Sequence, residues 1–265
     1  MKIAFIIPIY PKHYYYIYNL IDLIFQNNII IDIYLVFSNE NDYNVFDKKD
    51  KIKKIIIPQI KTFNIVTYKK FFALETLKND INYDYFIVCD AETTIIPENF
   101  TEINILNKIL KIYENKIIYA GETNCKKMKD IIKSSTTLIY NGNQLKNITK
   151  KYTLYFWWSD LPVYKREHLT DFFYKINYSN INWNHFDHKV YLSYLVLYHN
   201  FNIINLTEII GINWSLESYN TDNIDNLNLL KLNNYGFSYI TTNFYRNHIN
   251  FFMNEGTFLL YHLDR

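Results

Sequence analysis

Residues 83–94 read YDYFIVCDAETT, a run of aromatic and β-branched residues that ends in two carboxylates. Such a run is typical of a buried strand, which we place at Tyr85–Asp90. Side chains at positions i and i+2 of an extended segment project to the same side, so Asp90 and Glu92 are expected to converge. Two carboxylates suit one hard divalent cation that keeps coordination sites for diphosphate oxygens. The stretch therefore predicts a diphosphate site at the carboxyl end of a strand.

The first half of the chain alternates strand and helix patterns around this stretch. The expected strands are Ile3–Ile9, Ile29–Phe37 and Ile55–Pro58, and the expected helices are Tyr14–Phe25 and Lys69–Leu77. This order is typical of a doubly wound α/β protein whose ligands bind at the strand ends. The predicted fold class is therefore α/β, with a mostly parallel central sheet flanked by helices.

After Pro97 the sequence predicts a mixed α/β arrangement. The expected elements are helices at Phe100–Glu114 and Lys189–His199 and strands at Lys116–Ala120, Thr136–Tyr140 and Phe201–Leu206. A basic, polar stretch is expected from 125 to 133, and Asn141-Gly142 predicts a hairpin turn. No flexible linker stands out, so residues 1–125 and 126–265 are expected to form two halves of a single globular domain.

Composition excludes several classes of protein. The chain of 265 residues is 49% hydrophobic, which excludes wholesale disorder, and its formal net charge of +2 argues against a nucleic-acid partner. Two cysteines and no metal-ligand spacing argue against a disulfide framework. No signal peptide or membrane span stands out, so we expect a cytoplasmic protein. Its lysine groups leave peripheral contact with an anionic membrane open.

The Asp-x-Glu after the fourth expected strand gives residues 1–125 a layout that resembles the GT-A fold of nucleotide-sugar glycosyltransferases. In that superfamily an Asp-x-Asp motif, or a variant of it, binds Mn²⁺ or Mg²⁺, and the ion holds the donor diphosphate. The matching residues here are Asp90, Ala91 and Glu92. Glutamate at the second acidic position departs from the motif and lengthens one ligand by a methylene. A turn-capping role is the alternative for both acids.

The resemblance also implies where the donor would lie. Pro8 and Tyr10 at the end of the first strand, and Asn39 and Glu40 after the second, fall where the fold holds base and ribose. Lys70 is a candidate for neutralising phosphate or contacting the base. The alternatives are a polar turn for Asn39 and Glu40 and a solvent-facing helix position for the lysine.

An aromatic segment supplies candidates for the acceptor. Trp157, Trp158 and Tyr164 offer flat faces that suit the C–H faces of sugars, and Asp160 among them can orient hydroxyls. The alternative is that these aromatic residues belong to the core.

Asp187, just before the expected helix Lys189–His199, is a candidate general base with Asp160 as its rival, and a helix N-cap is its alternative role. The resemblance also makes His262, near the chain end, a candidate third metal ligand. The alternative is that this end of the chain is frayed and binds nothing.

These residues together favour a glycosyltransferase. The expected reaction moves a sugar from a nucleoside diphosphate donor, a UDP-sugar foremost, to a hydroxyl of a glycan acceptor with Mn²⁺ or Mg²⁺. One alternative is a sugar nucleotidylyltransferase, although the glycine-free segment Pro8–Lys12 counts against its usual triphosphate loop. The other is a catalytically inactive glycan-binding protein on the same fold. Stereochemistry and oligomeric state stay open.

Overall fold

The protein is described by a computed structural model. It describes residues 2–58, 65–123, 125–149, 154–157, 161–210 and 259–260.

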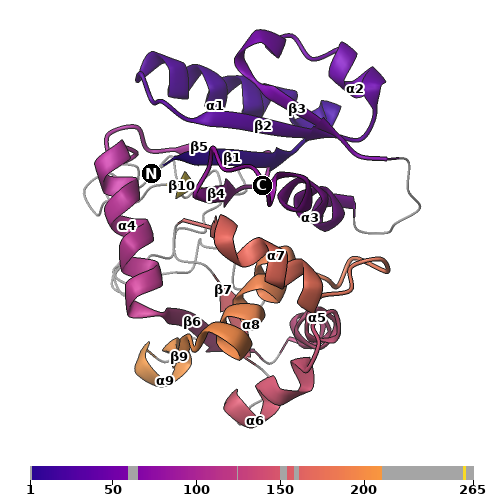
Figure 1. The fold of residues 1–265 in the computed structure, drawn as a ribbon, viewed down its shortest axis with the longest axis vertical. Helices are drawn as coiled ribbons and strands as arrows, with labels where there is room; N and C mark the ends of the chain where they lie inside the picture. The colour runs from indigo at the N-terminus through magenta and orange to yellow at the C-terminus, as the bar shows by residue number, and fades with distance from the viewer. Residues whose placement is uncertain are drawn as a thin grey trace.

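The central sheet confirms the predicted fold class. It has the strand order β3-β2-β1-β4-β8 (Figure 1). The first four strands run parallel, and β8 is antiparallel to β4. Their bounds are β1 (Ile3–Pro8), β2 (Asp32–Phe37), β3 (Lys53–Ile56), β4 (Tyr85–Val88) and β8 (Val163–Lys165). The chain adds β2 and β3 on one side of β1 and then β4 on its other side. The strand order therefore reverses between β1 and β4, which makes this pair the topological switch point.

Helices α1 (Tyr14–Gln26) and α3 (Ile65–Leu77) flank this sheet. The apolar stripe of α1 is buried at Ile17, Leu20, Ile21 and Ile24. Phe25, the last residue of the expected helix, is 47% exposed. Lys51 Nζ lies 4.8 Å from the Phe25 ring centre, so a cation covers part of this ring.

A second, smaller sheet has the order β7-β6-β9. Helix α4 (Glu102–Asn115) leads from the central sheet down to it in Figure 1. The strands are β6 (Ile117–Glu122), β7 (Leu154–Trp157) and β9 (Asn202–Asn205). Helix α8 (Asp187–His199) contacts both α3 and β7, so it connects the two sheets.

The remaining elements are short or pack around these two sheets. They are α2 (Glu40–Asn44), β5 (Thr94–Ile95), α7 (Arg166–Lys175), α9 (Leu206–Ile210), β10 (Leu259–Leu260) and the 3-10 turns η1 (Pro11–His13) and η2 (Lys49–Lys51).

The region from 125 to 149 differs from the sequence prediction. Helix α5 (Lys126–Thr137) occupies most of the expected polar stretch and the first two residues of the expected strand. It buries Met128, Ile131, Ile132 and Ser135 at helical spacing, a pattern that the lysines between them obscure. The predicted hairpin is also wrong: Asn141 takes a left-handed conformation (φ 60°) before η3 (Gly142–Gln144) and α6 (Leu145–Thr149).

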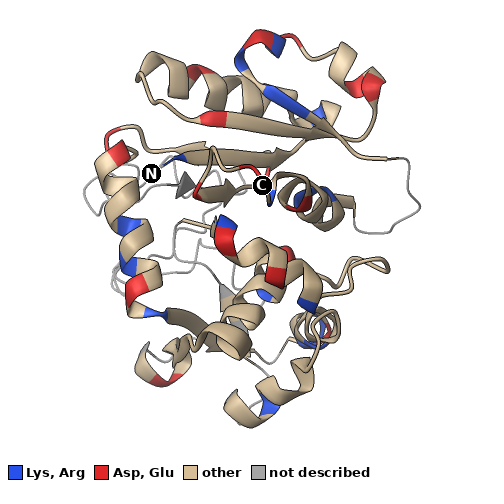
Figure 2. Cartoon of the chain, viewed as in Figure 1, with Lys and Arg blue, Asp and Glu red and all other residues tan. Residues whose placement is uncertain are grey.

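Figure 2 shows basic and acidic residues spread over both halves of the described chain. Among the described residues, no helix is long and apolar enough to cross a membrane.

Candidate active site

The carboxyl edge of the central sheet gathers many of the residues that the sequence singled out. β1 ends at Pro8 with Tyr10 two residues later, and β4 ends at Val88 with Asp90 two residues later. Because the strand order reverses between β1 and β4, these two ends border the crevice where open α/β sheets bind ligands.

The ammonium of Lys70 joins two aspartates at this edge. Its Nζ lies 2.8 Å from Oδ1 of Asp90 and 3.0 Å from Oδ1 of Asp187. The hydroxyl of Tyr164 donates a hydrogen bond to Oδ2 of Asp187 at 2.8 Å. We call Lys70, Asp90, Asp187 and Tyr164 the carboxyl-edge cluster. It brings together residues from α3, the β4 end, β8 and α8.

The members of the cluster differ in burial. The side chains of Lys70 and Asp187 are each 7% exposed, whereas that of Asp90 is 30% exposed. Burial alone would lower the pKa of Lys70, but the carboxylates of Asp187 and Asp90 outweigh it and raise this pKa above its ordinary value. Lys70 therefore stays charged. Two carboxylates and one ammonium leave one formal negative charge, and Asp90 is the member that faces outward.

Helix α3 also brings Lys69 to the carboxyl edge. Both lysines are buried, so the solvent-facing alternative for Lys70 is wrong. Lys69 Nζ donates to the Ile9 carbonyl at 2.5 Å and lies 3.8 Å from the ring centre of Tyr10. Burial lowers the pKa of Lys69 to about 7. The sequence offered Lys69 and Lys70 alike as candidates, because the pair carries no sign of which side chain enters the site.

Asp90 and Glu92 do not follow the extended geometry expected for them. β4 ends at Val88, and Ala91 and Glu92 lie in a turn. The same-side argument for positions i and i+2 therefore does not apply here. Asp90 contacts Lys70, while Oε2 of Glu92 lies 3.9 Å from Nδ1 of His13. His13 is a neighbour of the motif that the sequence analysis did not identify.

The hydroxyl of Tyr10 is buried and has no hydrogen-bond partner among the described residues. Burial, with the nearby charge of Asp90, raises the pKa of Tyr10, so this hydroxyl keeps its proton. Buried polar groups are rarely left unpaired. An orphaned donor beside Asp90 therefore marks a place where a ligand oxygen would be favoured.

Carboxylate oxygens are available to a divalent cation at the carboxyl edge, although Asp90 and Glu92 contact different neighbours, Lys70 and His13. Within the described residues, no group of three His, Cys, Asp or Glu side chains is arranged to hold a metal. Asp90 and Glu92 supply carboxylate oxygens, which hard cations prefer, and the cluster carries an excess negative charge. The chemistry of this donor set suits an ion whose other ligands are water and diphosphate oxygens.

The residues expected around base and ribose have structural partners. Asn39 is the N-cap of α2 and accepts from the backbone N–H of Asp42 at 2.9 Å. Glu40, 61% exposed, pairs with Lys54 at 3.2 Å. Pro8 is the last residue of β1 and is buried. The capping contact and the ion pair account for Asn39 and Glu40 without a ligand.

The residues expected to bind the acceptor are described only in part. Trp157 ends β7, where its backbone pairs with Tyr119, but its side chain lies outside the described residues. Trp158, Asp160 and His262 also lie outside them. Tyr164 is 1% exposed and directs its hydroxyl to Asp187.

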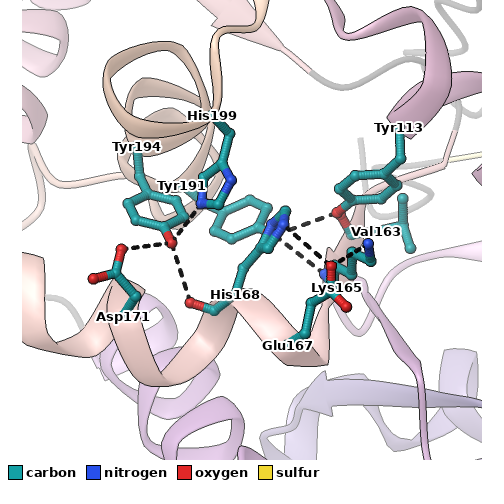
Figure 3. A network of polar contacts seen from close by, with 9 residues as sticks. All are labelled: Tyr113, Val163, Lys165, Glu167, His168, Asp171, Tyr191, Tyr194 and His199. Atoms are coloured by element: carbon teal, nitrogen blue, oxygen red, sulfur yellow. Dashed lines mark hydrogen bonds and ion pairs between the residues drawn. The ribbon is translucent and has the colours of Figure 1, made fainter.

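Tyr164 contacts a residue of a polar network that includes Tyr191, Tyr113 and His168; Figure 3 shows this network. The Tyr164 ring packs on Tyr191, with ring centres 4.3 Å apart. The Tyr191 hydroxyl accepts from the backbone N–H of Lys165 at 3.1 Å and lies 3.3 Å from both Tyr113 Oη and His168 Nδ1. These contacts fix the ring against which Tyr164 packs.

The same network contains two stacked histidines. The rings of His168 and His199 lie 3.9 Å apart, and Tyr194 bonds to both His199 and Asp171 (Figure 3). Burial, with the neighbouring His199, lowers the pKa of His168 to about 4. No spacing in the sequence indicates this network, because its members come from elements far apart in the chain.

Comparisons with known proteins give distant structural likenesses. No family model and no curated protein matches the sequence. One similar solved structure is a glycosyltransferase involved in the glycosylation of the major capsid of PBCV-1, with 10% identity and a TM-score of 0.46 over 100% of this chain and 94% of that chain. A second is S. aureus TarS 1-349, with 13% identity and a TM-score of 0.40 over 74% of this chain and 56% of that chain.

A third is a putative glucose-1-phosphate thymidylyltransferase from Bacillus anthracis, with 11% identity and a TM-score of 0.29 over 48% of this chain and 57% of that chain. Of these three structures, the first is described as a glycosyltransferase. All three likenesses are too distant to add to the description of the fold. The mixed α/β fold follows from the strand order and flanking helices described above.

Proposed function

We propose that this protein is a nucleotide-sugar-dependent glycosyltransferase whose donor binds at the carboxyl edge of β1 and β4. The observation that carries the proposal is the carboxyl-edge cluster at the topological switch point. Open α/β sheets bind their ligands at this point. The orphaned hydroxyl of Tyr10 adds a hydrogen-bond donor beside it.

The charge of the site supports a requirement for Mn²⁺ or Mg²⁺. Asp90, Asp187 and Lys70 sum to one negative charge, and Glu92 lies two residues beyond Asp90. A diphosphate brought to this edge would meet net repulsion without an added cation. Asp90 and Glu92 would hold the ion, which when bound offsets the charge that develops on the departing diphosphate.

The chain's own residues would divide the remaining work. The hydroxyl of Tyr10 would donate a hydrogen bond to an oxygen of the nucleotide sugar, and Lys70 would keep the Asp90 carboxylate in place. A UDP-sugar is the first donor to test and a glycan hydroxyl the proposed acceptor. An inverting reaction also needs a base for that hydroxyl, and Asp160 and Asp187 are the two candidates from the sequence.

A thermal-shift panel tests the proposal. UDP-, GDP-, CMP- and dTDP-sugars are added with and without Mn²⁺ to the wild type, Asp90→Ala and Asp32→Ala. A nucleotide sugar present at 100 times its dissociation constant stabilises the folded state by roughly 2.7 kcal/mol, which is visible as a shift in Tm.

We expect one nucleotide class to stabilise the wild type and Asp32→Ala but not Asp90→Ala. Asp32 is the matched control because it also pairs with a lysine but at the opposite edge of the sheet. If no nucleotide sugar stabilises the wild type under any condition, the glycosyltransferase proposal is wrong. Glycan binding alone would then favour a binding protein on this fold.

A further inference from the structure

Asp187 is bound on both of its carboxylate oxygens. Oδ1 accepts from the Lys70 ammonium at 3.0 Å, and Oδ2 accepts from the Tyr164 hydroxyl at 2.8 Å. Its side chain is 7% exposed. Asp187 is the first residue of α8, but its carboxylate bonds to α3 and β8 and does not cap its own helix.

Of the two carboxylates that contact Lys70, that of Asp187 is the more buried. The ammonium lies 2.8 Å from Asp90 and 3.0 Å from Asp187, but Asp187 is as buried as the lysine while Asp90 is 30% exposed. Asp187 therefore holds the ammonium from the buried side, and the same ammonium contacts Asp90 on the side nearer to solvent and orients it. A carboxylate that must receive a ligand is positioned by this contact.

Tyr164 in turn fixes Asp187. Its ring is packed on Tyr191, which is tied to Tyr113 and His168 by hydroxyl contacts of 3.3 Å (Figure 3). The route from this network to the site therefore runs through Tyr164, Asp187 and Lys70 to Asp90. Each link is a direct contact between described side chains.

We propose that Asp187 is a positioning residue: it holds the Lys70 ammonium against Asp90, so that α8 of the second half sets the donor-binding geometry of the first half. The proposal rests on the proposed function, and it assigns acceptor activation to a group other than Asp187. A general base must lie within hydrogen-bond reach of the proton it takes. In this site the exposed carboxylate is that of Asp90, whereas Asp187 is enclosed by Lys70 and Tyr164.

The test separates donor affinity from turnover in Asp187→Asn. The probe is UDP-glucose, or the nucleotide sugar that the thermal-shift panel selects, with Mn²⁺ present. Affinity is measured by calorimetry, and turnover is measured as release of the nucleoside diphosphate with water as the acceptor. For a positioning role we expect the dissociation constant to rise about tenfold, as for other residues that orient a ligand-binding side chain, with kcat close to the wild-type value.

Two further changes extend the test. Tyr164→Phe removes one hydroxyl and should weaken donor binding in the same direction, though less. Lys70→Met should weaken it at least as much as Asp187→Asn, and the double variant should show little added loss because both changes break one chain of contacts. Lys70→Arg keeps the charge and should recover part of the affinity.

Other outcomes contradict the inference. A fall in kcat of about 10²-fold or more in Asp187→Asn, with unchanged donor affinity, would identify a general base instead. Wild-type affinity and turnover in Asp187→Asn would also overturn it. Failure of the wild type to bind any nucleotide sugar removes the proposed function and this inference together, so the wild-type measurement distinguishes the two failures. Lys53→Met, at the opposite edge of the sheet, is the matched control and should bind as wild type.

Discussion

The two edges of the central sheet use the same residue types in different ways. At the amino edge, Lys53 Nζ lies 3.0 Å from Oδ2 of Asp32, and the hydroxyl of Tyr83 donates to the same oxygen at 2.5 Å. We call Lys53, Asp32 and Tyr83 the amino-edge cluster. It has one carboxylate for its one ammonium, and the side chains of Lys53 and Asp32 are 48% and 46% exposed.

The carboxyl-edge cluster differs in burial and in charge balance. Its lysine is 7% exposed and faces two carboxylates. A half-exposed, balanced pair is screened by water, whereas a buried and unbalanced group keeps its electrostatic field. The comparison shows that composition does not separate a structural cluster from a candidate site. Burial and an excess of negative charge at the switch point distinguish the candidate site from the structural cluster.

Replacing Lys70 should produce the largest difference between the two edges. Lys70→Met leaves two buried or half-buried carboxylates facing each other without their shared cation. Breaking a buried ion pair by removing one partner costs about 3–5 kcal/mol. We expect a loss of unfolding free energy in this range, measured by urea denaturation at neutral pH. A loss below about 1 kcal/mol would mean that the cluster is hydrated, and the contrast between the edges would disappear.

Acid titration sharpens the comparison with a third cluster, the stacked pair of His168, which is buried, and His199, which is partly buried. Because the fold lowers the pKa of His168 from 6.5 to about 4, it favours the neutral ring. The free energy of unfolding therefore holds its full His168 contribution above about pH 6.5. It falls as the pH drops from 6.5 towards 4, where the unfolded chain binds the proton more tightly, and the His168 contribution changes no further below about pH 4.

A shift of this size corresponds to about 3 kcal/mol. We expect urea denaturation at a series of pH values to show this loss in the wild type. His168→Phe keeps a ring beside His199 and should remove that part of the slope. Equal slopes in the two proteins would show that His168 is hydrated in solution.

The smallest effect is expected at the amino edge. Lys53→Met should cost at most about 1 kcal/mol, the usual range for a half-exposed ion pair. The loss should shrink further in 1 M salt, because exposed charges are screened there. Denaturation at low and high salt measures both quantities. A large, salt-independent loss would mean that the two edges are energetically alike.

Much of the fold was predictable because its central strands, β1 and β4, consist almost entirely of apolar and aromatic residues. Ile3–Ile9 and Tyr85–Asp90 read as buried strands, and the structure has strands at Ile3–Pro8 and Tyr85–Val88. The error at β4 matters most: the strand ends at Val88 and not at Asp90, and Glu92 lies in the following turn beside His13. Helix α5 was missed because four lysines among twelve residues obscured its buried stripe.

The site was predictable at the level of single residues but not of contacts. Asp90, Lys70, Asp187 and Tyr164 were each singled out from the sequence for separate roles. No local pattern indicates that they touch, because positions 70 and 187 lie 117 residues apart and meet only through tertiary packing. The capping role of Asn39, by contrast, follows from local chain geometry, and the polar-turn alternative anticipated it.

The position of β8 has a consequence for synthesis of the chain on the ribosome. The free edge of β4 is covered by Val163–Lys165, which the chain reaches only after β6 and β7. Until those residues emerge, the nascent central sheet presents β4 as an unpaired edge, and Lys70 lacks Asp187 until still later. Unpaired strand edges promote association between chains. A ribosome pausing before residue 163 would therefore leave an intermediate that is prone to pair with a neighbouring nascent chain.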